Sequence, residues 1–125
     1  MIEHSLDTAH SILHLRLKSA IEQGDFAQVA KTVDPHIRAT GGLAGVIIEA
    51  PGIPGWESFG AMVEHFRFVR DHHKQIKKIG LVTDSALGNV AEHLASHFIA
   101  AEIKRFPAGD VEAAKRWAMT PPAAS

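Results

Sequence analysis

The sequence has 125 residues, of which 46% are hydrophobic and 22% charged, a composition typical of one folded domain rather than a disordered chain. Its formal net charge of -1 argues against a general nucleic-acid binder, and its lack of cysteine excludes disulfides, thiolate metal sites and cysteine nucleophiles. Nine histidines stand out, although their number alone indicates no reaction.

No segment is typical of a targeting or membrane-spanning sequence. The first ten residues carry Glu3 and Asp7 without a long apolar run, so we expect no signal peptide. The apolar stretches are far shorter than the roughly 18–20 residues that cross a bilayer. We therefore expect a cytoplasmic protein with one domain over residues 1–119 and a disordered tail at 120–125.

The N-terminal part of the chain predicts a hairpin followed by a helix. Apolar and polar residues alternate strongly over residues 12–17 and more weakly over 2–6, which is the period of strands with one buried face. Apolar residues at helical spacing then cover residues 26–37. Gly24 and Asp25 precede this helix and offer a capping residue, and the glycines at 41–42 end it.

The middle of the chain predicts alternating strands and helices. Residues 43–49 form an almost continuous apolar run, which suits a central parallel strand covered on both faces. A proline-bracketed turn at 51–55 leads to a helix over about 57–73. A strand is expected at 77–83 and a helix at 86–99.

The C-terminal part predicts one more strand and one more helix. Residues 102–106 alternate, and Asp110 is placed to cap a helix over 111–118 that Trp117 anchors. The complete order is ββαβαβαβα, which predicts a single α/β domain with right-handed crossovers.

Three segments resemble the SpoIIAA-like family, which is related in fold to STAS domains and to the lipid-binding Sec14 (CRAL-TRIO) domain. They are residues 46–49 followed by Gly55 and Trp56, residues 78–84, and residues 102–106 followed by Asp110, Glu112, Ala113, Ala114 and Trp117. The chain departs from the family pattern in having Pro51 and Pro54 before Gly55, and Thr83 where glycine is frequent.

The resemblance implies a fold but no established reaction. It implies a four- to five-stranded, mostly parallel sheet with an antiparallel first strand, wound as a STAS/SpoIIAA-like βα superhelix. STAS relatives often carry a regulatory Ser or Thr at a helix start. Ser58 lies in the comparable region, but no D-S-x-G-L motif surrounds it. We therefore do not assign Ser58 as a phosphorylation site.

The carboxyl ends of the predicted parallel strands form the best candidate for a ligand site. Ligands bind at that edge in open α/β sheets, and helix N-termini there favour anions. The candidate ligand-binding residues at this edge are Glu49, Trp56, Glu57, Ser58, Asp84 and Ser85. The alternative is structural, with Trp56 clamping a helix start and Asp84 with Ser85 capping the next helix.

An apolar stripe on the predicted helix 57–73 suggests a second part of the site. Phe59, Met62, Phe66 and Phe68 are candidates to line a pocket for an acyl chain, and packing against the sheet is the alternative. Neither a G-x-G-x-x-G motif nor a P-loop is present, so we expect no nucleotide cofactor.

Two further groups of residues suggest chemistry. His93 and His97 share a helix face, but no third ligand and no general-base Glu accompany them, so we expect no metal. Arg67, Arg70 and Lys74 share another face that suits a lipid headgroup, a phosphate or an acidic partner. A solvated helix end explains the basic residues equally well.

These observations leave three functions open. The first is a non-catalytic binding or regulatory module for a protein partner or a small apolar or anionic ligand. The second is a lipid-binding or membrane-surface-associating domain. The third is a small enzyme, which requires a histidine within hydrogen-bond reach of Glu49 or Asp84. We also expect a homodimer, because a sheet of this kind leaves an edge strand unpaired.

Overall fold

The computed structural model describes residues 2–50, 59–84 and 101–120. One sheet has the order β1-β2-β3-β4-β5, with β1 antiparallel to β2 and all other neighbours parallel. The strands are β1 (Ile2–Asp7), β2 (Ile12–Leu17), β3 (Leu43–Glu49), β4 (Ile76–Val82) and β5 (Glu102–Phe106). The expected α/β class with an antiparallel first strand is confirmed.

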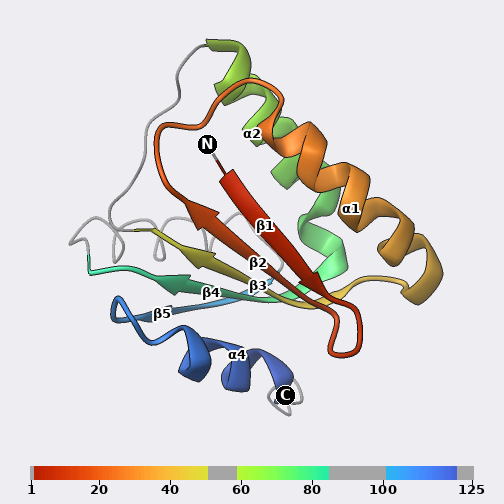
Figure 1. The fold of residues 1–125 in the computed structure, drawn as a ribbon. Helices are drawn as coiled ribbons and strands as arrows, with labels where there is room; N and C mark the ends of the chain where they lie inside the picture. The colour runs from red at the N-terminus through yellow and green to blue at the C-terminus, as the bar shows by residue number, and fades with distance from the viewer. Residues whose placement is uncertain (1, 51–58, 85–100, 121–125) are drawn as a thin grey trace.

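The described helices lie on both faces of this sheet. They are α1 (Asp25–Thr40), α2 (Phe59–His72), which runs into the short turn η1 (His73–Gln75), and α4 (Val111–Met119). Figure 1 shows α1 and α2 together over one face and α4 under the other. The helix expected at 86–99 lies outside the described residues.

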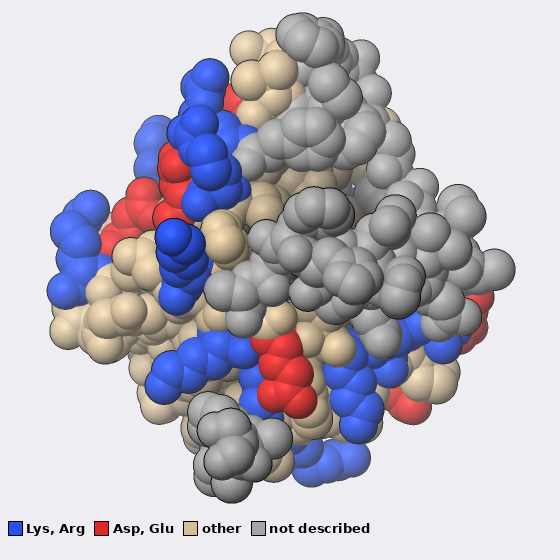
Figure 2. Space-filling view, turned by 180° about the vertical axis from the view of Figure 1, so that it is seen from behind, with Lys and Arg blue, Asp and Glu red and all other residues tan. Residues whose placement is uncertain are grey.

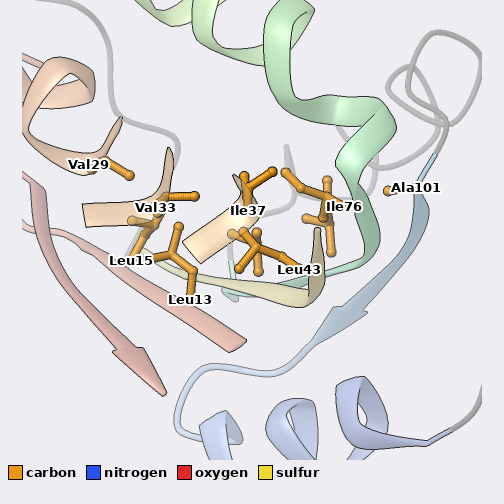
Figure 3. Close-up of a cluster of buried hydrophobic side chains, with 10 residues drawn as sticks. Leu13, Leu15, Val29, Val33, Ile37, Leu43, Ile76 and Ala101 are labelled. Carbon is orange, nitrogen blue, oxygen red and sulfur yellow. The ribbon is translucent and has the colours of Figure 1, made fainter. Parts of the chain in front are cut away.

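The first hydrophobic core lies between α1 and the sheet. Val29, Val33 and Ile37 project from α1 onto Leu13 and Leu15 of β2, as Figure 3 shows. Val29 and Val33 are completely buried. The apolar spacing along residues 26–37 predicted this buried face of α1. The alternation along β2 predicted the apolar strand face on which it packs.

The second core lies on the opposite face, where α4 packs very closely on β3 and β4. A Cβ built on Gly45 would lie 2.6 Å from the Cβ of Ala118, and one built on Gly80 would lie 3.4 Å from the Cβ of Ala114. Ala114 and Ala118 are buried. Small residues on both surfaces therefore let the helix and strand backbones approach one another.

A buried lysine fixes the end of α4. Lys78 of β4 is 3% exposed, and its Nζ donates to the carbonyl oxygen of Trp117 at 3.1 Å and to Oγ1 of Thr120 at 2.6 Å. The same ammonium lies 5.0 Å from the centre of the Trp117 ring. A cation at a helix C-terminus satisfies carbonyls that have no partner within the helix. Thr120, the first residue of the expected tail, takes part in this cap.

The N-caps of α1 and α4 fall in the predicted segments, but neither is capped by a side chain. Gly24, with a φ of 94°, is the N-cap of α1, and no side chain caps that position. Asp25 instead accepts from the backbone N–H of Glu22 at 2.7 Å. Asp110 occupies the N-cap of α4 as predicted, but its side chain makes no capping hydrogen bond. Whether a side chain caps a helix depends on the geometry of the turn before it. The residue type alone does not reveal that geometry.

Candidate functional site

An apolar cavity of about 230 Å³ lies between α2 and the sheet, on the face that α1 also covers. Side chains of β2, β3, β4 and β5 form one wall, among them Leu15, Val46, Ile79 and Ile103. These residues belong to the alternating positions that point to the α1 and α2 side. None of the described lining residues is Asp, Glu, Lys or Arg.

The wall opposite the sheet is a row of aromatic rings. His65 of α2 stacks on Phe26 of α1 with ring centres 4.7 Å apart, and Phe26 lies 4.9 Å from Phe68. Phe68 in turn stacks on His72 at 4.1 Å. All four rings line the cavity, so the cavity lies between aromatic and aliphatic surfaces.

His72 also links the two helices beside this cavity. Its Nδ1 lies 2.8 Å from the carbonyl oxygen of Phe68, and its Nε2 lies 2.7 Å from Oδ1 of Asp34 on α1. The His72 ring therefore connects the backbone of α2 to a side chain of α1 at the edge of the cavity.

His65, in the same row of rings, is held in its neutral form. Burial lowers the pKa of its imidazole from the ordinary value of 6.5, because the charged ring loses hydration there. At neutral pH the ring therefore adds an uncharged polar group to a wall made mainly of hydrocarbon.

A second space lies at the carboxyl ends of the strands, where the sequence predicts a ligand site, and Leu17 lines both this space and the cavity. An open space of about 500 Å³ lies there, lined on one side by Arg16, Lys18 and Glu49 and on the other by Ala108 and Gly109. It faces solvent.

Glu49 is the centre of the polar contacts at this edge. Its Oε2 lies 2.9 Å from Nε2 of His14 and 3.5 Å from Nε of Arg16. The register explains the contact, since His14 and Arg16 on β2 pair with Ile47 and Glu49 on β3. A histidine and a carboxylate therefore converge, which is the arrangement that acid–base chemistry requires.

Asp84 and Lys18 have structural partners. Oδ1 of Asp84 accepts from the backbone N–H of Ala108 at 2.8 Å and so ties the end of β4 to the turn after β5. Lys18 pairs with Glu3 at 2.9 Å, and this hydrogen bond lowers the pKa of the Glu3 carboxyl. Neither residue approaches Glu49 in any contact that the described residues make.

Several residues that the sequence predicted for a site lie outside the part of the chain that the structure describes. They are Trp56, Glu57, Ser58 and Ser85, together with His93 and His97. Phe59, Met62 and Phe66 belong to α2 by their backbone, but their side chains lie outside the described part. Of the aromatic residues predicted for this helix, Phe68 is the one that the structure places in the cavity wall.

The basic residues of the α2 end are exposed. Arg67, Arg70 and Lys74 are all at the surface, and Arg70 pairs with Asp71 at 2.9 Å. Figure 2 shows acidic side chains among the basic ones on the face that it displays. No single-sign surface is therefore visible on that face.

Two kinds of feature are absent from the described residues. No helix among them is long and apolar enough to cross a membrane. No group of three or more of their His, Asp and Glu side chains is arranged to hold a metal ion.

Sequence reasoning missed His14, His65 and His72 as site residues. The alternation over residues 12–17 marked His14 as facing away from Leu13 and Leu15, but pairing with Glu49 depends on the order of the strands. The stacking of His65 and His72 depends on how α2 lies across α1. A helical-wheel count places both on the same side as Phe68, which is the one signal the sequence carries.

Comparisons with known proteins agree on the fold. A family model described as SpoIIAA-like matches residues 12–119. A crystal structure of an uncharacterized protein from Shewanella loihica PV-4, from the DUF3478 family with a SpoIIAA-like fold, is similar with a TM-score of 0.68 and 18% identity. The match covers 94% of this chain and 91% of that one. No curated protein matches the sequence.

Proposed function

Because the chain belongs to the SpoIIAA-like family and has an apolar cavity between α2 and the sheet, we propose that it is a non-catalytic module that binds a small apolar ligand. The cavity is the observation that carries this proposal. Pockets for small molecules are concave and mostly apolar, with few polar groups, and this cavity has that character.

The size of the cavity supports a ligand of modest size. An apolar cavity of about 150 Å³ holds benzene, so about 230 Å³ has room for about nine or ten non-hydrogen atoms. A lipid with two acyl chains is much larger than this. The free energy of binding comes mainly from apolar surface removed from water.

Calorimetric titration with 1-decanol tests the proposal. We expect binding to the unmodified chain and at least a tenfold loss in Ile48→Phe and Leu81→Phe, because both residues line the cavity and a larger ring occupies its volume. Two variants are used because either substitution alone can disturb folding.

Met119→Phe is the matched control. Met119 is 46% exposed at the end of α4, on the opposite face of the sheet, and we expect unchanged affinity there. The proposal is wrong if the unmodified chain binds no decanol, or if folded cavity variants bind it as tightly as the control.

The contact between His14 and Glu49 favours a second candidate function, a small enzyme using His and carboxylate chemistry. The imidazole is oriented by the carboxylate, and its Nδ1 is then the group that exchanges a proton. Hydrolysis of chromogenic esters and phosphates, lost in His14→Gln, supports this candidate. Absence of turnover, or turnover that His14→Gln retains, removes it.

A further inference from the structure

One cation lies on the same face of the sheet as the cavity. Arg105 on β5 pairs in register with Leu81 and follows Ile103 by two residues, and both of these residues line the cavity. Since alternate residues of a strand share a face, Arg105 points to the cavity side. Its neighbour Phe106 belongs to the core under α4, which confirms the alternation.

The guanidinium of Arg105 contains one buried donor atom that has no hydrogen-bond partner among the described residues. This donor atom is Nε. At the other end of the cavity, by contrast, His72 is paired with Asp34. A buried guanidinium N–H without an acceptor is costly, and a carboxylate is the acceptor that matches its geometry best.

We propose that the cavity takes the apolar body of a medium-chain carboxylate, whose carboxylate group accepts hydrogen bonds from the guanidinium of Arg105. This inference rests on the proposed function, because it assigns a ligand class to the same cavity. The described lining residues include no Asp or Glu to repel an anion. The volume of about 230 Å³ suits a body of about nine or ten non-hydrogen atoms and a single chain.

The direct test compares decanoate with decanamide, which has the same shape and no charge. We expect the unmodified chain to bind decanoate at least tenfold more tightly, as measured by calorimetry at constant pH and ionic strength. Equal affinity for the two compounds, or tighter binding of decanamide, overturns the inference and leaves the proposed function standing. If neither compound binds, the proposed function itself fails.

Variants of neighbouring cations make the test specific. Arg105→Gln is expected to remove the tenfold preference for decanoate over decanamide, and Arg105→Lys is expected to retain part of that preference. Lys104→Gln is the matched control, because Lys104 lies on the same strand and its Nζ lies 5.4 Å from the Phe106 ring on the opposite face. The inference is wrong if folded Arg105→Gln keeps the full preference, or if Lys104→Gln loses it.

Discussion

The two faces of one sheet are packed in opposite ways. On one face, α4 lies directly on β3 and β4, because Gly45, Gly80, Ala114 and Ala118 offer no side chains that hold the backbones apart. On the other, α2 packs mainly against α1 rather than against a strand among the described elements. The cavity lies in the space below α2. A helix held mainly by another helix can therefore leave room for a ligand, whereas a helix seated on glycines cannot.

The largest expected effect breaks the close packing under α4. Gly45→Val places branched carbons where even a Cβ would lie 2.6 Å from Ala118, and neither backbone can yield cheaply. Overpacking of this kind typically costs about 1–3 kcal/mol, and we expect the upper end or a failure to fold. Urea denaturation measures the loss. A change below about 1 kcal/mol contradicts close packing at this face.

A smaller effect is expected from the buried ammonium on the same face. Lys78→Met keeps the length of the side chain but removes the donors to Trp117 and Thr120, and we expect a loss of about 2 kcal/mol. Lys77→Met is the control, because Lys77 is exposed on the adjacent position of β4 and should change stability by less than about 0.5 kcal/mol. Equal effects in the two variants rule out the cap.

Acid should lower the stability of the fold because of His65, which lines the cavity. Its pKa is lowered in the folded state, so the folded chain binds fewer protons than the unfolded one near pH 6.5. The stability contributed by the neutral ring is complete above pH 6.5 and is lost as the pH falls below it. We expect the urea midpoint to drop between pH 7.5 and 5.5 by more in the unmodified chain than in His65→Phe. Identical drops contradict this assignment.

The smallest expected effect comes from adding one methyl group to the cavity. Val46→Ile extends a lining residue into free space, and we expect stability to stay constant or rise by up to about 0.8 kcal/mol. The substitution sits next to Gly45 in sequence but on the opposite face, so it is the direct counterpart of Gly45→Val. A loss of more than about 1 kcal/mol means that the wall at Val46 is already tightly packed.

The sequence predicted the strands well because each has a simple pattern. The alternation in β2 and the apolar run of β3 depend on neighbours close in the chain, and Glu49 was placed at the strand end for the same reason. The contact of Glu49 with His14 depends instead on strand order. The cavity depends on the height of α2 above the sheet, which no local pattern encodes. Lys78 shows the same limit, since a lysine in a strand gives no sign that it will be buried under a helix end.

Methyl resonances distinguish the two faces in one measurement. With 1-decanol added, we expect chemical-shift changes for Leu15, Val46, Ile48, Ile79 and Ile103 of the cavity face, and little change for Ile12, Ile47 and Val82 of the α4 face. The same experiment on Ile48→Phe should show no shifts at the cavity face. Shifts centred on the α4 face, or none on either face at saturating 1-decanol, would contradict the proposal that the space under α2 binds an apolar ligand.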